Sequence, residues 1–234
     1  MVKIRRLIDF IVKWLLGAFF SQRTILLMRF DTIRFIARAK NYFRKDLLPP
    51  KNKLHFGCAW RRVPGWLNVD VRHSEFDVDL ADGRLPWKNN VFETTVSQHV
   101  IEHLELETEL LPLLRELHRV MKPGGEIWLS CPDIESICNS YLIHAMEDLL
   151  LDRLTRFPNY SIGELPTNHF INALFHQQGE HKNLYDFVLL KWILQRSGFT
   201  GIERVVEADL LHQFPEFPQR NDDLQSIYVR AVNS

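Results

Sequence analysis

The amino-acid sequence predicts an α/β fold built on a mostly parallel sheet of about seven strands, with helices on both faces of the sheet. Three observations support this prediction. Short apolar runs of strand length alternate with longer amphipathic segments of helical spacing from residue 53 onward. Glycine or proline punctuates these segments. The 234 residues, 46% of them hydrophobic, are enough for one globular domain with a sizeable core and some additions.

Seven segments have the length and composition of strands. In chain order they cover residues 53–57, 66–71, 76–80, 92–97, 126–132, 202–208 and 225–232. Alternation of strands with helices along the chain favours a sheet that is parallel at least in its first five strands. The last two segments follow each other and are expected to form a final strand pair.

Three amphipathic segments of the body predict helices. Leucines recur on one face between residues 110 and 121, and Pro123 with Gly124 ends that segment. Residues 145–154 form a second helix, whose leucines join the core or make a dimer face. Residues 183–199 form a third.

The connection between the first two strands is unusually short. Only about nine residues separate them, whereas a crossover that carries a helix needs roughly a dozen or more. One face of the sheet therefore lacks its usual cover near these strands. We expect a helix at residues 31–46 to fill that gap.

Residues 1–52 are predicted to be a basic amphipathic helical arm, followed by the domain at residues 53–234. Residues 1–53 carry 13 Lys/Arg against 3 Asp/Glu, and the remainder carries 16 against 26. Pro49 and Pro50 mark the boundary. The arm has two interpretations. It either lies on an anionic membrane surface, through residues 1–46, or packs on the domain with its Arg and Lys side chains in solvent.

The start of the chain resembles a signal peptide only superficially. Asp9 and Lys13 interrupt the apolar run, no cleavage signal follows, and the nine uncharged residues before Arg23 are too few to cross a bilayer. The three cysteines form no C-x-x-C pair, which fits a reducing compartment. We therefore expect a cytoplasmic protein, peripheral on the inner membrane face. The acidic body makes nucleic acid an unexpected partner.

Candidate site residues follow the predicted strands, because ligands of parallel α/β sheets bind at the carboxyl ends of the strands. A small-residue turn follows the first strand, and an acid that could accept hydrogen bonds from ribose hydroxyls follows the second. The dinucleotide fingerprint G-x-G-x-x-G is absent, which disfavours NAD. The candidates are Gly57, Cys58, Ala59, Asp70, Asp79, Asp82, Gln98, His99, Pro132 and Asp133.

Three of these stretches together resemble a known family. They read "LHFGCAWRRVPGWLNVDV" from residue 54, "LADGRLPWKNNVFETTVSQHVIEHL" from residue 80 and "LLRELHRVMKPGGEIWLSCPD" from residue 113. In this order and spacing they resemble the Rossmann-like class I S-adenosylmethionine-dependent methyltransferases. The closest branch is the methyltransferase type 11-like group found among bacterial cell-surface glycan genes. The resemblance covers residues 53–133 strongly and continues more weakly through residues 180–199.

The resemblance implies S-adenosyl-L-methionine as the cofactor and assigns roles by position. The turn at residues 57–59 would lie under the methionine moiety, and Asp70 would bind the ribose. Asp82 would be the acid beside the adenine, with Asp79 as a competing alignment. Residues 98–99 would lie beside the cofactor. Ala59 departs from the family, which has a second glycine there, and adds a methyl group near the cofactor.

The implied reaction is methyl transfer to a small-molecule acceptor, a hydroxyl of a sugar or of a lipid-linked glycan. A hydroxyl acceptor benefits from a general base, and histidine is the usual base near pH 7. We choose His181 as that base, with His176 second, because both lie where a lid over the acceptor is expected. The alternative is that each is a surface or capping histidine.

Two other functions fit parts of the sequence. Ala59 and the short first connection would also fit a non-catalytic methyltransferase-like subunit that docks a membrane-proximal glycan-assembly complex. His99, Glu102 and His103 spell H-x-x-E-H, the zinc motif of inverted zinc peptidases, which would need a further ligand such as Glu180. A predicted strand runs up to Ser97, so His99 lies at or before the start of any helix. We therefore assign no metal ligands.

Overall fold

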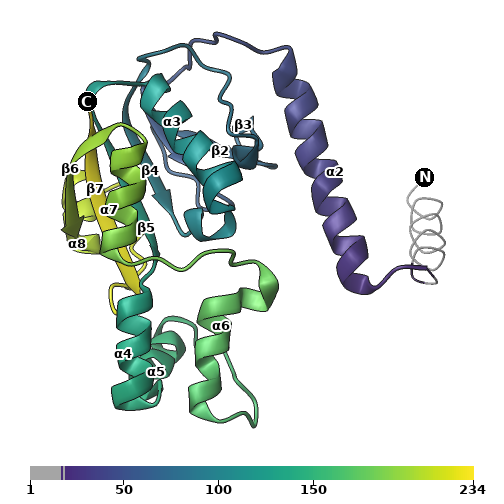
Figure 1. Ribbon diagram of the computed structural model, residues 1–234, viewed down its shortest axis with the longest axis vertical. Helices are drawn as coiled ribbons and strands as arrows, with labels where there is room; N and C mark the ends of the chain where they lie inside the picture. The colour runs from purple at the N-terminus through teal and green to yellow at the C-terminus, as the bar shows by residue number, and fades with distance from the viewer. Residues whose placement is uncertain (1–16, 18) are drawn as a thin grey trace.

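The computed structural model describes residues 17 and 19–234 and contains one seven-stranded sheet (Figure 1). The strand order is β3-β2-β1-β4-β5-β7-β6. Strands β1 to β5 are parallel, and β7 is antiparallel to both of its neighbours. The predicted α/β fold and its final strand pair are confirmed, and that pair is antiparallel. The strands are β1 Lys53–Phe56, β2 Leu67–Asp70, β3 Phe76–Asp77, β4 Phe92–Gln98, β5 Met121–Pro132, β6 Phe199–Val205 and β7 Ser226–Asn233.

The main core lies between one face of the sheet and two helices. Helices α3 (Leu111–Val120) and α7 (Phe187–Arg196) cover this face, and a π-helical turn, η3 (Leu106–Leu110), leads into α3. The predicted leucine stripe is buried here because i, i+3 and i+4 positions share one helix face. Asp186 caps the start of α7 by accepting a hydrogen bond from the Leu189 amide at 2.7 Å.

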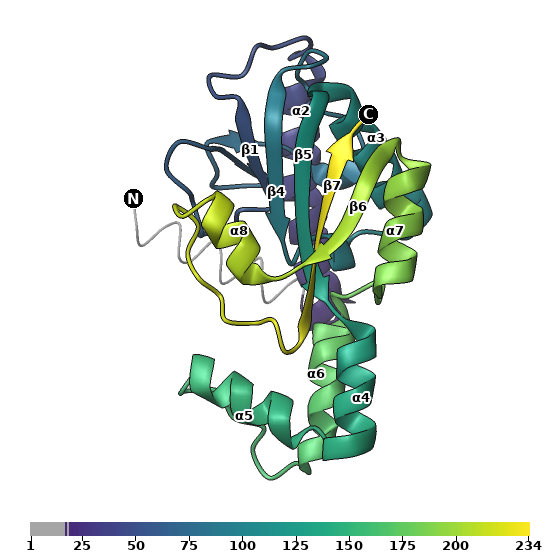
Figure 2. The same cartoon turned by 90° about the vertical axis from the view of Figure 1, so that its left-hand side faces the viewer.

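The opposite face carries a second core around aromatic side chains. Alternate residues of β4, β5 and β7 point to it, because successive side chains of a strand face opposite sides. Helix α8 (Glu207–Gln213) covers this face, as Figure 2 shows, and the segment after it contributes Phe214 and Phe217. Trp66 packs edge-on against both rings, with centroid distances of 5.2 and 4.9 Å.

This aromatic cluster, and not the arm helix, fills the gap that the short connection between β1 and β2 was expected to leave. The short connection between β1 and β2 carries no helix, as predicted, but α8 and the residues after it fill the space. Helix α8 itself was not predicted, because its residues were assigned to the sixth strand and to a connection. The helix at residues 31–46 does not cover this face.

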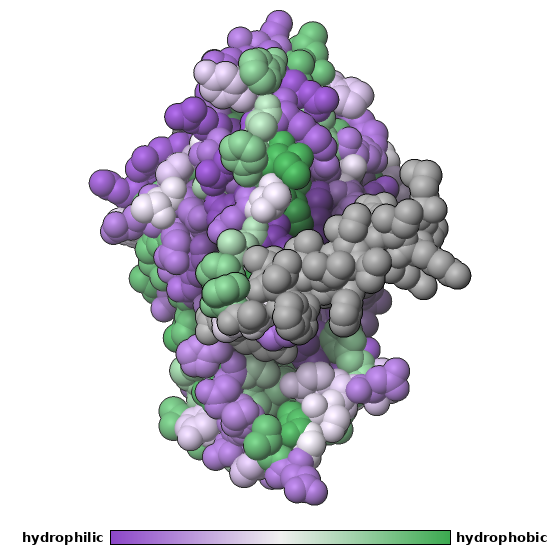
Figure 3. Space-filling view, turned by 90° about the vertical axis from the view of Figure 1, so that its right-hand side faces the viewer, coloured by the Kyte–Doolittle hydropathy of each residue, from purple (hydrophilic) through white to green (hydrophobic). Residues whose placement is uncertain are grey.

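The arm helix is α2 (Gln22–Tyr42), which begins at the capping residue Ser21 and lies beside β3 (Figure 1). It meets the domain through one buried alanine, Ala37, and through polar contacts. Phe35 is 70% exposed on the outer side. Figure 3, which views this side, shows a column of apolar side chains between hydrophilic ones. Within the described residues, no helix is long and apolar enough to cross a membrane.

A group of helices extends beyond the carboxyl ends of the strands (Figure 2). It has a separate apolar cluster that includes Ile137, Leu149 and Phe170. The segment predicted as a helix at residues 145–154 belongs to this group and joins its core through Leu149. The helices are α4 Ile134–His144, α5 Glu147–Arg156 and α6 Phe170–His176, and the short turns η4 Thr167–His169 and η5 Gln177–Gly179 flank α6. Two further short turns, η1 Leu80–Asp82 and η2 Ile101–His103, lie in the domain.

Candidate functional site

The turn after β1 brings a backbone amide to the acid after β2. Gly57 has a φ of +69°, and an added Cβ would lie 2.1 Å from a methyl group of Val100. Glycine is therefore required here by packing within the chain. The Ala59 amide donates to Asp70 Oδ2 at 2.8 Å, and the Val71 amide donates to Asp70 Oδ1 at 2.6 Å. These bonds fix a half-buried carboxylate at the sheet edge.

Cys58 is buried in the same turn. Burial is the main reason that the pKa of its thiol rises to about 11. Because the thiolate is the reactive form, this residue is a packed side chain at neutral pH and no nucleophile.

The end of β4 places Gln98 and His99 at the same edge. Gln98 is buried, and its Nε2 has no hydrogen-bond partner within the described structure. A buried amide donor without a partner costs free energy unless a ligand or water satisfies it. His99 has a φ of +57°, and its amide donates to the Ser130 carbonyl oxygen at 2.8 Å. The strand therefore ends in a strained turn that redirects the imidazole.

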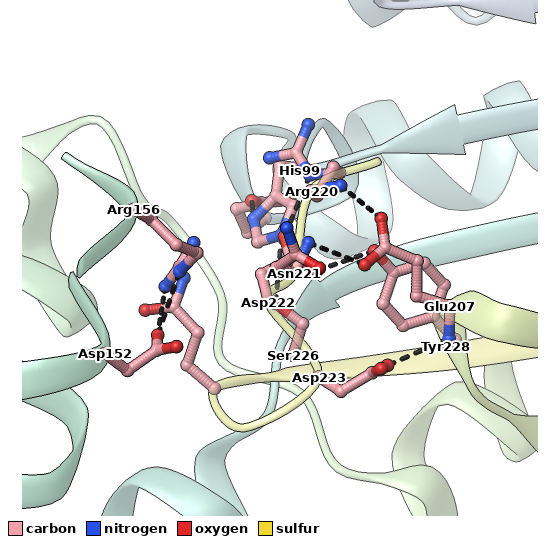
Figure 4. A network of polar contacts seen from close by, with 12 residues as sticks. His99, Asp152, Arg156, Glu207, Arg220, Asn221, Asp222, Asp223, Ser226 and Tyr228 are labelled. Carbon is pink, nitrogen blue, oxygen red and sulfur yellow. Dashed lines mark hydrogen bonds and ion pairs between the residues drawn. The ribbon is translucent and has the colours of Figure 1, made fainter. Parts of the chain in front are cut away.

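The His99 imidazole lies between two buried carboxylates, one of which, Asp222, is shown in Figure 4. Its Nε2 is 3.0 Å from Asp222 Oδ2, and its Nδ1 is 3.2 Å from Glu102 Oε1. The carboxylate of Asp222 only accepts hydrogen bonds, so Nε2 of the His99 ring carries a proton. Burial lowers the pKa of His99, but the contacts with Asp222 and Glu102 outweigh burial and raise it.

Asp222 is the centre of this network. The Tyr228 hydroxyl donates to its Oδ1 at 2.6 Å, and the Arg220 Nε donates to its Oδ2 at 2.8 Å. Burial alone would raise the pKa of Asp222, but His99 and Arg220 hold it well below its usual range. The Glu207 carboxylate, at the start of α8, accepts hydrogen bonds from the amides of Arg220 and Asn221 and so fixes the loop that carries Asp222.

The acids after β3 are held by the arm helix. Arg34 Nε lies 3.0 Å from Asp79 Oδ2, and Arg38 Nε lies 2.6 Å from the same oxygen. Asp79 also caps η1 by accepting from the Ala81 amide at 3.1 Å. The Asp79 carboxylate is thus fully engaged by the chain. Asp82 is more open, with 36% of its side chain exposed and one Arg38 contact at 3.4 Å.

The two histidines chosen as bases lie in different environments. His181 is half-buried, and its ring centroid lies 4.9 Å from that of His103. Burial lowers the pKa of His181. The side chain of His176 is exposed to solvent.

The residues of the peptidase motif are not arranged as that hypothesis requires. β4 ends at Gln98, and the turn η2 does not begin until Ile101. His99 instead faces Glu102 and Asp222. His103 Nδ1 donates to the backbone oxygen of Glu180, 3.3 Å away, and not to a side chain.

Two hollows of the described surface lie away from this edge. One, of about 390 Å³, lies beside α8 and is lined by residues that include Trp128 and Arg230. The other, of about 480 Å³, lies at the amino ends of the strands, near Leu48 and Lys122. Neither includes a predicted site residue.

Comparison with known proteins identifies the kind of domain that contains these residues. Residues 60–129 match a family model described as a methyltransferase domain. The match runs from the turn after β1 into β5 and includes Asp70, Gln98 and His99. The chain therefore carries a methyltransferase domain, and it is an enzyme that uses S-adenosyl-L-methionine as its cofactor.

Solved structures with a similar overall arrangement share little sequence with this chain. A SAM-dependent methyltransferase from Thermotoga maritima is 14% identical, covers 91% of this chain and 96% of its own, and has a TM-score of 0.43. One from Archaeoglobus fulgidus is 15% identical, with coverage of 91% and 100% and a TM-score of 0.44. Phosphoethanolamine N-methyltransferase 2 of Haemonchus contortus, in complex with S-adenosyl-L-methionine, is 13% identical, with coverage of 83% and 52% and a TM-score of 0.41. A search of curated proteins gave no match.

Sequence reasoning missed several residues of this region. Asp222 was not a candidate, although a signal existed, since residues just before an antiparallel strand reach the same edge as residues just after the parallel ones. Arg34 and Arg38 were recognised as basic residues of a helix, but no local pattern pairs them with Asp79. Glu102 was not among the candidate site residues.

Proposed function

We propose that this methyltransferase acts on a hydroxyl group of a small acceptor, a sugar or a lipid-linked glycan. The observation that carries the proposal is the match to a methyltransferase domain over residues that include a fixed carboxylate at Asp70 and an unpartnered amide at Gln98. The donors and acceptors at this edge suit a polar nucleoside-containing ligand.

The residues present fit the cofactor. Asp70 would accept hydrogen bonds from the ribose hydroxyls with the lone pairs that the amides of Ala59 and Val71 leave free. Gln98 would donate through its Nε2 and so satisfy a buried group. Ala59 is exposed, so its methyl group lies at the surface of the turn. Asp82 suits the adenine side better than Asp79, because Asp79 already pairs with two arginines.

The chemistry needs little from the protein beyond position and proton transfer. When bound, the cofactor would supply a methyl group on a sulfonium for in-line transfer to the acceptor oxygen. The hydroxyl proton must leave as the O–C bond forms. His181 is our choice of base, since its Nδ1 donates to the Leu174 carbonyl oxygen at 2.7 Å and leaves Nε2 free to accept a proton. His99 is not our choice, because its two ring nitrogens already face Asp222 and Glu102.

A membrane-proximal acceptor is supported by the arm helix. Helix α2 has exposed apolar side chains, among them Leu27 and Phe35, and more Arg and Lys than acidic residues. This combination suits the interface of an anionic membrane. We propose that the protein is cytoplasmic and peripheral, with residues 1–46 as the contact.

A methyl-transfer screen against sugar nucleotides and lipid-linked glycans tests the proposal. Asp70→Ala is the control, and its loss of ribose contacts should weaken cofactor binding by about 1–3 kcal/mol, measured by calorimetry. Unchanged affinity in that variant would refute the role of Asp70. If wild-type protein binds no cofactor at millimolar concentration, the non-catalytic docking subunit becomes the better explanation. Methylation of amines but not of hydroxyls would overturn the acceptor class.

A further inference from the structure

Three potential metal ligands meet beside the end of β4. They are Glu102, His103 and His181, and their ligand atoms all lie within 4.8 Å of one another. Glu102 is buried with 1% of its side chain exposed, and both histidines are half-buried. They come from two segments far apart in the chain. The peptidase motif therefore contributes two of its three residues to a cluster that it did not predict.

The hydrogen bonds around the histidines leave lone pairs free for an ion. His181 Nδ1 lies 2.7 Å from the Leu174 carbonyl oxygen, and His103 Nδ1 lies 3.3 Å from that of Glu180. A carbonyl oxygen only accepts, so each Nδ1 carries the proton and each Nε2 carries a lone pair. An imidazole oriented by a carbonyl through its other nitrogen is the usual arrangement of metal-binding histidines.

The inward atoms of this cluster lack partners. His181 Nε2 is buried without a hydrogen-bond partner, and neither Glu102 oxygen accepts a well-directed hydrogen bond within the described structure. Glu102 Oε1 has an ion-pair contact with His99 Nδ1 at 3.2 Å, which leaves Oε2 free. Buried polar atoms without partners are costly, and a bound cation would satisfy all of them at once.

Backbone contacts fasten the two segments together. The amides of Lys182 and Asn183 donate to the Glu102 carbonyl oxygen at 2.8 and 3.3 Å. The Tyr185 hydroxyl donates to the Ile101 carbonyl oxygen at 3.2 Å. The ligand set is thus held in place by contacts that do not involve the ligand atoms themselves, as preorganised sites require.

We propose that Glu102, His103 and His181 bind a divalent ion of the Zn²⁺ class. Two imidazole nitrogens and one carboxylate oxygen are a typical zinc set with an open fourth position. Ligand atoms of a tetrahedral zinc site lie roughly 3.4 Å apart, given bonds of about 2.1 Å, so the side chains must close modestly around the ion. A loaded site would occupy the His181 lone pair, so His181 serves either as a ligand or as a base at any moment.

Metal binding by the full-length chain tests this inference without any methyl-transfer assay. Protein cleared of metal with a chelator should bind one equivalent of Zn²⁺ by calorimetry. Co²⁺ in its place should give the visible absorption of a tetrahedral N/O site. His103→Ala and His181→Ala should each weaken Zn²⁺ binding by more than about 100-fold, beyond the range of an outer-shell change.

His176→Ala is the matched control, because His176 belongs to the same region but is exposed and outside the cluster. It should bind Zn²⁺ like the wild type. Equal binding by wild type, His103→Ala and His181→Ala, or no stoichiometric binding by the wild type, would overturn the inference. If His181→Ala fails to melt cooperatively, His103→Ala decides, since His103 is half-buried and its removal should leave the fold intact. Because cofactor is absent throughout, failure here is separate from failure of the proposed function.

Discussion

At the scale of single residues, His55 makes the stability of the protein depend on pH. It is buried in β1, its Nδ1 donates to Asn68 Oδ1 at 3.1 Å, and its ring packs on Phe217. Burial is the main reason that its pKa falls to about 4, the hydrogen bond to Asn68 opposes this fall, and the charge of Arg220 adds to it. His55 is therefore neutral in the folded protein across the physiological range.

The sign of the effect follows from proton binding. Between about pH 6.5 and about pH 4 the unfolded chain binds a proton at this residue and the folded chain does not, so stability falls as the pH falls. At pH 5 the contribution should be a loss of about 2 kcal/mol relative to pH 7.5. Urea unfolding at both pH values checks it. His55→Gln should lose this component, whereas exposed His144→Gln should keep it, and an equal response of the two variants would contradict the assignment.

Gly57 is constrained by its neighbour and by its backbone. Gly57→Ala should destabilise the protein by about 2–4 kcal/mol, because the new methyl group meets Val100 at a positive φ. Gly65→Ala is the control for backbone strain alone, since Gly65 has a φ of +82° with open space around it, and should cost about 1–2 kcal/mol. Adding Val100→Ala should recover part of the Gly57→Ala loss in chemical unfolding. If it recovers nothing, contact with Val100 is not the cause.

At the scale of elements, the arm helix is attached by polar contacts. Within α2, Ala37 is buried, while Arg34 and Arg38 pair with Asp79. Partly exposed ion pairs contribute about 1 kcal/mol or less each. Removal of residues 1–46 exposes Asp79 to water, so its charge is not left buried. We expect the truncated protein to unfold cooperatively, with Tm lowered by roughly 2–6 °C.

Calorimetric melting of full-length and truncated protein measures this effect. The variant Asp79→Asn in the full-length chain is the comparison, because it removes the ion pairs and keeps the helix. A truncated protein that melts without cooperativity would show that α2 belongs to the core. That result would restore the role that the sequence predicted for the arm.

Elements were predictable where a local pattern determines them. The leucine stripe of α3 follows from periodicity, and the five parallel strands follow from the alternation of strands with helices. Helix α8 was missed because its buried Leu210 packs with Phe214 against Trp66, about 150 residues away in sequence. The predicted position of α2 was wrong because it, too, depends on contacts with residues far away in the sequence. An amphipathic pattern shows that one side of a helix is buried, but not which surface buries it.

At the scale of the whole molecule, the position of a residue at the end of a strand predicts the site better than a short sequence motif does. Asp70 and Gln98 lie at the carboxyl edge, as parallel strands require. The motif H-x-x-E-H predicted a helix with two facing imidazoles, but His99 turned toward Asp222 because a strand ends one residue before it. Distant partners such as Asp222 and His181 reach the edge through the antiparallel strand and the segment before α7, and sequence spacing does not encode those approaches.

The arm and the domain carry opposite net charges. Residues 1–53 have an excess of 10 positive charges and the remainder an equal excess of negative ones. The domain should therefore be repelled by an anionic bilayer while the arm is attracted, at about 1 kcal/mol for each Lys or Arg near the surface. Full-length protein should co-sediment with vesicles that contain phosphatidylserine, and protein lacking residues 1–46 should not.

Salt and lipid composition separate this attraction from nonspecific adhesion. Binding should weaken as salt rises from about 0.1 M to about 0.5 M, because screening shortens the reach of the charges. Some affinity should persist at high salt if the exposed apolar side chains of α2, such as Leu27 and Phe35, enter the interface. The double variant Leu27→Ser, Phe35→Ser should lose the binding that persists at high salt. Its Tm should be unchanged, since both side chains are exposed. Equal sedimentation of full-length and truncated protein would show that the arm is not the membrane contact.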